Sequence, residues 1–351
     1  MANISAKDVA ELRKRTGAGM MDCKNALVEA GGDTAKALEV IQKKGLAKAV
    51  KAAGRIAADG AIVSGVSADG QHGVLVEVNC QTDFVSRGEE FRSYAESVAK
   101  AALENAYADV EALNDHSVGG KSLREHAEAL TAKSGEKHAI RRMQRFDVSG
   151  KGIVASYIHH GARLGVLVEI NAEKGTDPVV KEFANEVALQ IASMGPKFVR
   201  KEDAPVETIE KQREIFVAQM KNEDDETVAT FEDFKRRADE EGGEHSDKVK
   251  EHLKSLEKKA ATAKSRPEVA RLKILEGKLA KWLNEMTLLE QVSVKDSSKT
   301  IKQLLTEFSG AQGKTEIKHF ARFELGEGVD KGPAKDFATE VAEMTAASQK
   351  Q

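Results

Sequence analysis

Glycine-rich segments are the parts of this sequence that most resemble nucleotide-binding motifs. Gly120-Lys121-Ser122 resembles the end of a phosphate-binding loop, but Asp115 occupies the position of the required first glycine and no strand leads into the segment. Gly326-x-Gly328 is followed by Gly332 one residue too late for the dinucleotide fingerprint, and Gly17-x-Gly19 has no third glycine. We therefore interpret the first segment as the start of a helix and the other two as turns.

Cysteine and histidine are the other residue types here that could do chemistry. Cys23 and Cys80 have no Cys-x-x-Cys partner, so their spacing fits neither a metal site nor a redox pair. His159 and His160 are adjacent, and on a strand two adjacent side chains point to opposite faces of the sheet. We therefore expect neither metal nor thiol catalysis.

The segment Asn79-Cys80-Gln81-Thr82-Asp83-Phe84-Val85 remains as a candidate site. A strand that we expect to be buried runs here into a turn that ends in Asp83 and Phe84. In one interpretation Phe84 folds back to cover the hairpin and Asp83 caps the following helix. In the other, a rigid loop presents an aromatic wedge beside a carboxylate to a partner protein. The residues alone leave both interpretations open.

Composition limits the function classes. The 351 residues contain 54 Lys and Arg against 57 Asp and Glu, which gives a net charge of −3. A general binder of nucleic acid or of anionic membranes needs a basic surface, so this balance argues against both classes. No apolar run approaches the roughly 20 residues that span a bilayer, and residues 1–9 lack the apolar stretch of a signal peptide. With only two cysteines, a reducing cytoplasm is the expected compartment.

Three short helices are predicted at the start of the chain. Ser5 and Asp8 form a helix-starting box, and Leu12 continues the apolar stripe that begins at Val9. Glycines end the first two helices, and Asp33 caps a third, which we expect to end at a further glycine, Gly45. Three helices this short bury little core, so we expect them to form a docking head for the larger remainder of the chain.

An internal repeat organises the middle of the chain. Three elements recur at one ungapped offset of 92 residues: Gly60–Val66 with Gly152–Ile158, Gly73–Asn79 with Gly165–Asn171, and Phe91 with Phe183. Each copy is predicted to be a hairpin covered on one face by helix. A hairpin alone is marginally stable, and the alternation over 317–325 predicts a third strand for the second copy. Phe337–Ala342 echoes Phe183–Ala188 and predicts a terminal amphipathic helix.

A long charged insertion separates the second copy from its third strand. Apolar residues recur at helical spacing on two arms, at Val228, Phe231 and Phe234 and at Val249, Leu253 and Leu256. A narrow apolar stripe on charged segments predicts an antiparallel two-helix hairpin, with Gly242-Gly243 at its tip. Ser265-Arg-Pro-Glu268 has capping-box spacing, so the returning arm is expected to stop and restart there. The alternative is a disordered acidic linker.

The predicted fold class is therefore α+β, with a three-helix N-terminal head, a duplicated core built on hairpin sheets, a long antiparallel coiled-coil insertion and a C-terminal helix. The expected domains are the head at 1–45, a linker at 46–59, the first core subdomain at 60–148, the second at 149–205 plus 290–330, the hairpin at 206–289 and a C-terminal helical module at 331–351.

Four segments resemble the bacterial elongation factor Ts family. They are Leu12-Arg-Lys-Arg-Thr-Gly-Ala-Gly-Met-Met-Asp-Cys-Lys24, Glu77-Val-Asn-Cys-Gln-Thr-Asp-Phe-Val85, His160-Gly-Ala-Arg-Leu-Gly-Val-Leu-Val168 and Phe320-Ala-Arg-Phe-Glu-Leu-Gly-Glu-Gly328. The resemblance covers nearly the whole chain. It implies a ubiquitin-associated-like (UBA-like) head, two related α+β subdomains, a coiled-coil hairpin and a C-terminal helix. The chain departs from the family pattern at Ser86, where a small apolar residue is common, and in a hairpin that is longer than usual.

The function implied by the resemblance is guanine nucleotide exchange on elongation factor Tu, the GTPase that carries aminoacyl-tRNA to the ribosome. Exchange makes and breaks no covalent bond, so we expect no enzyme activity, no cofactor and no direct nucleotide, nucleic-acid or membrane binding. The expected partner is elongation factor Tu in its GDP-bound and nucleotide-free states. Pairing of two chains through their cores stays open.

The resemblance also implies the contact residues. Phe84, beside Thr82 and Val85, would enter an apolar gap between switch-region helices while Asp83 fixes the position, and the displaced helix would disturb the Mg²⁺ site. The head would grip another helix of the GTPase through Leu12, Arg13, Met20 and Met21. Adjacent helical positions do not share a face, so we expect at least one of the two methionines to be core. His160 is either a further contact or a satisfied strand-end histidine.

Two other function classes stay open. A structural or RNA-binding protein would use the charged hairpin as an arm, although the mixed signs of its charges argue against RNA. An enzyme would need a pocket between the two repeats that no motif reveals.

Overall fold

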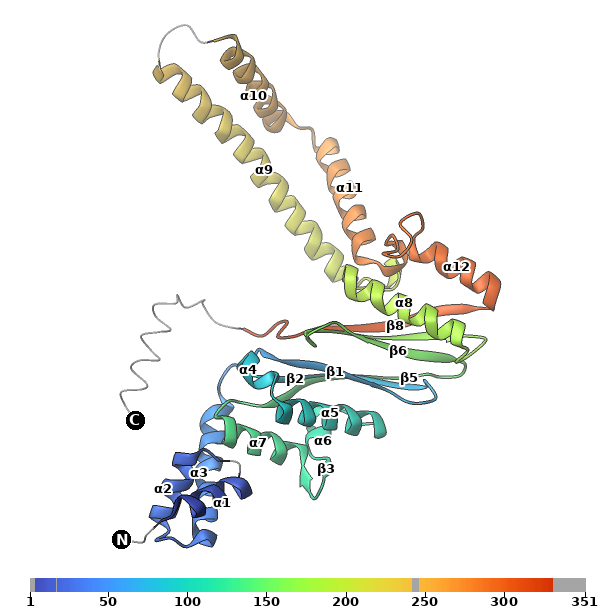
Figure 1. The fold of residues 1–351 in the computed structure, drawn as a ribbon. Helices are drawn as coiled ribbons and strands as arrows, with labels where there is room; N and C mark the ends of the chain where they lie inside the picture. Colours follow the sequence, from blue (N-terminus) through green and yellow to red (C-terminus); the bar gives the residue numbers. More distant parts are fainter. Residues whose placement is uncertain (1–3, 17, 242–245, 331–351) are drawn as a thin grey trace. The chain divides into compact units, whose positions relative to one another are not determined.

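The computed structural model describes residues 4–16, 18–241 and 246–330 (Figure 1). The helices are α1 Ala6–Thr16, α2 Met20–Glu29, α3 Thr34–Ala53, α4 Asp83–Ser86, α5 Glu89–Glu104, α6 Val110–Asn114, α7 Leu123–Ser134, α8 Pro178–Met194, α9 Val206–Glu241, α10 Asp247–Ser265, α11 Glu268–Met286 and α12 Ile301–Gln312. The strands are β1 Asp59–Val66, β2 His72–Cys80, β3 Ser117–Val118, β4 Lys121–Ser122, β5 Ala139–Asp147, β6 Gly152–Ile158, β7 Leu164–Ala172 and β8 Thr315–Glu324. The fold class is α+β, as predicted.

The described chain forms two compact units, which we describe separately. One contains the residues up to Ser193 and those from Phe308 onward, and the other contains Met194–Glu307.

The head of the first unit has the predicted caps. The backbone N–H of Ser5 donates to the Asp8 carboxylate and the N–H of Asp8 donates to the Ser5 hydroxyl, which closes the box before α1. Asp33 accepts from two backbone N–H groups at the start of α3. The helices bury a small common core of Val9, Leu12, Cys23, Ala26, Leu27 and Ala37.

The third helix does not end at Gly45, so that prediction is wrong. α3 continues to Ala53 and packs against α7. A Cβ atom on Gly45 would lie 2.9 Å from the Cβ of Ala132 on α7. Gly45 therefore permits a close approach of two helices, and its flexibility is not used to stop one.

The repeat at offset 92 is confirmed by two sheets of the same construction. The strand orders are β1-β2-β5 and β6-β7-β8, with every pairing antiparallel. Both sheets have a register shift at the same repeat position, after Glu77 in β2 and after Glu169 in β7. The third strand predicted over 317–325 is β8. The corresponding strand of the first copy, β5, was missed.

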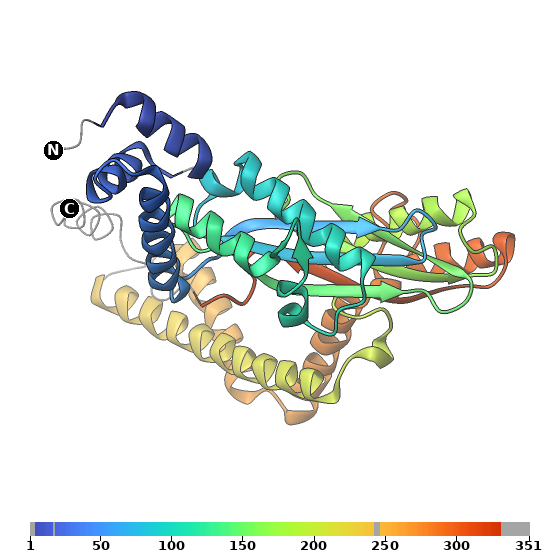
Figure 2. The ribbon, with the colours of Figure 1, turned by 90° about the horizontal axis from the view of Figure 1, so that it is seen from below.

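The two sheets face each other between layers of helices, with α5 and α7 outside the first sheet and α8 outside the second (Figures 1 and 2). Equivalent residues of the two copies meet between the sheets: Ile62 with its counterpart Val154, and Leu75 with its counterpart Leu167. The hydroxyl groups of Ser64 and its counterpart Ser156 are 3.1 Å apart. The packing therefore has approximate two-fold symmetry.

Backbone contacts between the copies are reciprocal as well. The N–H of Ile62 in β1 donates to the carbonyl of Ala162 in the β6–β7 turn at 2.7 Å. The N–H of Val154 in β6 donates to the carbonyl of Gly70 in the β1–β2 turn at 2.8 Å. Gly70 and Ala162 are counterparts, and both have positive φ, 70° and 55°. Each hairpin turn is thus held by the edge strand of the other copy.

The second unit contains the helices of the predicted hairpin. α10 and α11 pack along α9, and Met220, Leu275 and Leu279 form a buried cluster. The six apolar residues of the predicted stripe are half-buried. The arm is interrupted between Ser265 and Glu268, as expected. The predicted capping box is absent there, because the Ser265 hydroxyl donates to the carbonyl of Ala261. Gly242-Gly243 and the C-terminal module at 331–351 lie outside the described residues.

Candidate functional site

The candidate site begins where β2 ends. Thr82, in an extended conformation, precedes the single-turn helix α4. Its N–H and its hydroxyl both donate to the carboxylate of Glu136, at 3.0 and 2.8 Å. The thiol of Cys80 donates to the carbonyl of Thr82 at 3.2 Å, and Gln81 accepts from the N–H of Lys137. The residues that lead into α4 are therefore held to the segment that precedes β5.

Phe84 is the most exposed large apolar side chain of the part of the chain that the structure describes. Its side chain is 84% exposed, while the next residue, Val85, packs against the core of the first copy. The interpretation in which Phe84 folds back over the hairpin is therefore wrong. Because Thr82 is hydrogen-bonded before α4 and Val85 packs against the core within it, the ring of Phe84 projects from an anchored backbone.

Asp83 does not cap α4, since it is the first helical residue and Thr82 is the N-cap. Its carboxylate pairs instead with Arg87 one turn later, at 2.9 Å. An exposed ion pair at this spacing contributes about 0.3–0.5 kcal/mol to stability. The Asp83 carboxylate is thus half-exposed beside Phe84 and has little part in holding the fold together.

Cys80 lies directly beneath this loop. Burial raises the pKa of its thiol to about 12, and the nearby carboxylates of Glu136 and Asp59 add to the effect. The thiol is therefore neutral at physiological pH and acts as a small packing group. Within the ranges 4–16, 18–241 and 246–330, no cluster of three or more potential metal ligands is found.

His160 lies in the turn between β6 and β7, not on a strand, and so does His159. Both side chains are exposed, and the ring of His159 contacts the hydroxyl of Tyr157 at 3.0 Å. The turn itself is ordered by Ala162, whose carbonyl accepts from Ile62, and by Arg163, whose guanidinium donates to Asp59 at 3.0 Å. Sequence reasoning missed Asp59 and Arg163, because their contact joins residues 104 positions apart.

The head residues divide into buried and exposed groups. Leu12 is completely buried in the head core, and its contact with a partner stays a prediction. Its place on the apolar stripe of α1 turns it towards α2 and α3. Arg13 is exposed, and Met20 and Met21 are 59% and 63% exposed. The expectation that one methionine is core is wrong, because both precede the turns of α2 that are buried.

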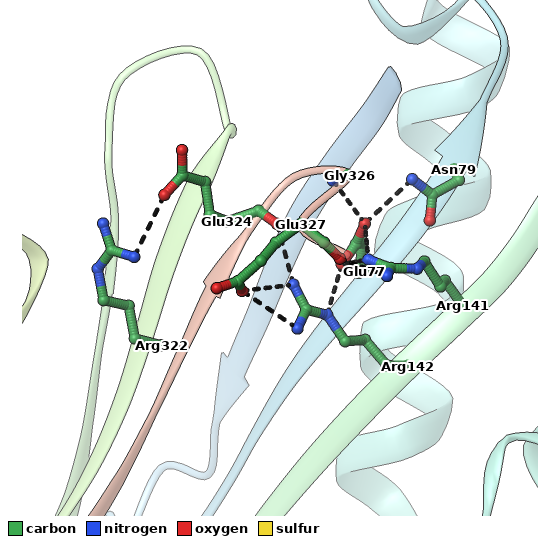
Figure 3. Close-up of polar contacts among 8 residues, drawn as sticks. All are labelled: Glu77, Asn79, Arg141, Arg142, Arg322, Glu324, Gly326 and Glu327. Atoms are coloured by element: carbon green, nitrogen blue, oxygen red, sulfur yellow. Dashed lines mark hydrogen bonds and ion pairs between the residues drawn. The ribbon is translucent and has the colours of Figure 1, made fainter. Parts of the chain in front are cut away.

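A buried carboxylate holds the end of β8 against the first copy (Figure 3). Glu77 is fully buried and accepts from Arg141, Arg142 and the N–H of Gly326 at 2.9, 2.6 and 2.9 Å. Burial alone would raise the pKa of Glu77, but these donors and Asn79 hold it below its usual range. In the second copy, the counterpart Glu169 pairs with His319 at 2.9 Å. The first of these clusters fixes the turn from which the chain continues towards residue 331.

None of the described helices is long and apolar enough to cross a membrane.

Comparison with known proteins places these features in a family. The family model described as Elongation factor TS matches residues 81–231 and 242–327. The chain is 41% identical over 345 residues to a protein named elongation factor Ts from Symbiobacterium thermophilum, a match that covers 97% of this chain and 98% of the relative. It is 39% identical to elongation factor Ts of Clostridium botulinum and 40% identical to that of Clostridium perfringens. Each of these two matches covers 343 residues, 97% of this chain and 99% of the relative. These relatives are matched over almost their whole length.

Proposed function

The chain belongs to the elongation factor Ts family, and from this premise we propose that it is a guanine nucleotide exchange factor for elongation factor Tu. It would promote GDP release, and so GTP reloading, during translation elongation. Exchange breaks no covalent bond, so the work is done by binding. If the protein weakens the grip of the GTPase on GDP by some factor, GDP weakens the grip of the GTPase on the protein by the same factor.

The observation that carries the proposal is the exposure of Phe84 on a turn that Thr82 and Val85 anchor to the first copy. The Phe84 ring presents apolar surface to water, which is unfavourable. Burial of this surface at an interface with a partner gives a favourable free energy of binding. Because the backbone of α4 is already ordered, binding would lose little further conformational entropy.

In the proposed mechanism, Phe84 enters an apolar gap between switch-region helices of the GTPase, with Thr82 and Val85 setting its position. Asp83 fixes the approach through its half-exposed carboxylate. Displacing a switch helix disturbs the Mg²⁺ site of the GTPase, and the diphosphate charge of GDP then loses its neutralising partner. GDP release is faster as a result.

Further contacts are proposed for two other surfaces. Arg13, Met20 and Met21 would bind another helix of the GTPase domain, where flexible methionine side chains adapt to the partner surface. His160 would contact a third region from the β6–β7 turn. Both GDP-bound and nucleotide-free elongation factor Tu are proposed partners.

The finer domain plan is part of the same proposal. The head would be a UBA-like domain, and residues 206–289 would form the coiled-coil hairpin of the family. The boundaries given above for the linker, the two core subdomains and the C-terminal module stay predictions, as does pairing of two chains through their cores.

Phe84→Ala tests the proposal. We expect GDP release from elongation factor Tu, at saturating exchange factor, to slow at least about tenfold, which corresponds to about 1.4 kcal/mol of coupling. The measurement is stopped-flow loss of a fluorescent GDP at several concentrations of each variant, with thermal melts of the same preparations. The melting temperature should hardly change, because the ring is exposed.

Phe91→Ala is the matched control. Phe91 is buried in α5, so its truncation should cost about 3–5 kcal/mol of stability and lower the melting temperature clearly. Full stimulation of GDP release by Phe84→Ala would contradict the wedge mechanism. A wild-type protein without effect on GDP release would contradict the exchange function itself.

A further inference from the structure

One carboxylate lies between the two segments that carry proposed partner contacts. Asp59 is the first residue of β1. Its Oδ1 accepts from the N–H of Gly60 at 2.7 Å and from the hydroxyl of Ser86, at the end of α4, at 3.2 Å. The same hydroxyl also lies 3.1 Å from the carbonyl of Asp83, so its hydrogen is shared between the two acceptors. Its Oδ2 accepts from the guanidinium of Arg163, in the β6–β7 turn, at 3.0 Å. The two oxygens of a single side chain therefore serve two segments that are distant in sequence.

Each of these segments is also held to the first copy at another point. The N-terminal side of α4 is held by Thr82 on Glu136, and Ser86 lies at the opposite end of the same turn. The β6–β7 turn is held through Ala162 and Ile62, and Ile62 is three residues along β1 from Asp59. Asp59 joins the two segments directly, because it accepts a hydrogen bond from each of them.

The environment of Asp59 favours the charged form. Its side chain is largely buried, whereas that of Arg163 is more than half exposed. Burial would raise the pKa of the carboxyl, but the Gly60 N–H, Arg163 and Ser86 together hold it below its ordinary value. The ionised carboxylate is thus maintained by the same groups that it positions. Hydrogen bonds to an ionised acceptor are shorter and stronger than neutral ones.

We propose that Asp59 is a positioning residue that fixes Phe84 on α4 relative to His160 on the β6–β7 turn, through Ser86 and Arg163. This inference rests on the proposed function. A GTPase that is contacted at two points is bound at a lower cost in conformational entropy when the separation of the two contacts is set before binding. Ser86 supplies the hydroxyl on the α4 side.

Two single variants and the double variant test whether Ser86, Asp59 and Arg163 act as one chain of contacts. Ser86→Ala cuts the contact to α4, and Arg163→Met cuts the contact to the turn. Each should lower the GDP release rate at saturating exchange factor by about threefold to tenfold, the range expected for a coupled contact. Because the link is serial, the double variant should be no slower than the slower single variant. Two effects that multiply would overturn the proposal.

Hydrogen exchange of the free protein gives a readout that does not depend on activity. Asp59→Asn keeps an acceptor for Ser86 but loses the charge that binds Arg163. Amide exchange should become faster in both 83–87 and 159–164. Glu111→Gln is the matched control, since it breaks the exposed pair between Glu111 and Arg124 at 2.7 Å in the same copy. The control should leave both segments and the GDP release rate unchanged.

The outcomes separate the inference from the function on which it rests. If wild-type protein accelerates GDP release and Asp59→Asn retains both the full rate and slow amide exchange, the positioning role is overturned and the exchange function stands. If Asp59→Asn melts like the wild type but has a lower rate and faster exchange in both segments, the role is supported. If the wild-type protein itself leaves GDP release unchanged, both proposals fail.

Discussion

At the scale of single residues, the loop after β2 is positioned by groups that lie far away along the chain. Glu136 holds Thr82 across 54 residues, and the backbone next to Glu136 also holds Gln81. His138 follows directly, buried against the ring of Phe91 at 5.9 Å between centroids. Its Nδ1 contacts the carbonyl of Glu136 at 2.8 Å. The segment that holds the Phe84 loop therefore includes a titratable imidazole, that of His138.

This ring predicts a pH dependence of stability. Burial lowers the pKa of His138 below its ordinary value of 6.5, while the carbonyl and the charge of Glu136 act in the opposite direction. With a lowered pKa in the folded state, the unfolded chain takes up the proton first. Stability is complete above about pH 6.5 and falls as the pH drops below it.

Thermal melts between pH 8 and pH 5 check this prediction against two variants. His138→Asn removes the titration and should flatten the dependence of melting temperature on pH. His160→Asn, at an exposed position, should leave the wild-type slope. If the melting temperature falls equally with pH in the wild type and in His138→Asn, other titratable groups cause the loss of stability at low pH.

At the scale of elements, Gly45 shows that a glycine can either end a helix or allow two helices to pack closely. A glycine after an apolar stripe favours a helix end, and α3 nevertheless continues for two further turns because α7 packs against it. The available space at Gly45 is smaller than a methyl group requires, since a Cβ would lie 2.9 Å from Ala132. Close packing therefore determines the residue, whereas local propensity would prefer alanine.

Gly45→Ala should consequently destabilise the protein, although alanine is the better helix former by about 0.5–1 kcal/mol. Separating α3 from α7 to fit a methyl group should cost about 1–3 kcal/mol. Gly277→Ala in α11 is the control, because a Cβ there has no neighbour within 4 Å and should give the propensity gain alone. Urea unfolding of both variants measures the difference. A stabilised Gly45→Ala protein would show that the two helices can separate freely.

Elements with strong local signals were predictable from the sequence. The caps at Ser5 and Asp33, the first two strands of each copy and the repeat offset each depend on a few neighbouring residues. β5 was missed because the register shift opposite Glu77 interrupts its alternation, so that Ile140 and Phe146 face different cores. The exposure of Phe84 was not decidable either, since Glu136, which holds the loop, has no local pattern that relates it to Thr82.

At the scale of the whole molecule, the head and the repeats are expected to have separable roles. A chain that starts at Gly45 keeps the part of α3 that packs against α7 and loses α1, α2 and the exposed methionines. We expect it to bind elongation factor Tu about tenfold to a hundredfold more weakly, the loss expected for removing an interface with strong contacts. The repeats should still melt cooperatively.

Titration calorimetry with the GTPase and calorimetric melting of the free variant check the two parts of this prediction. Met20→Ser combined with Met21→Ser in the full-length chain is the companion variant, because it removes the exposed apolar contacts and retains the head. Non-cooperative melting of the shortened chain would mean that the head and the repeats share one core.

The reciprocal packing of the two sheets has a consequence for the origin of the fold. Ile62 and Leu75 meet the counterparts of themselves, and each hairpin turn binds the edge strand of the other copy. A self-complementary interface of this kind is what a symmetric dimer of one shorter polypeptide presents. An ancestral polypeptide with a single repeat copy would bury the same residues by forming a homodimer. Gene fusion would have made that encounter intramolecular, so that assembly became independent of cellular concentration and the two halves were free to diverge.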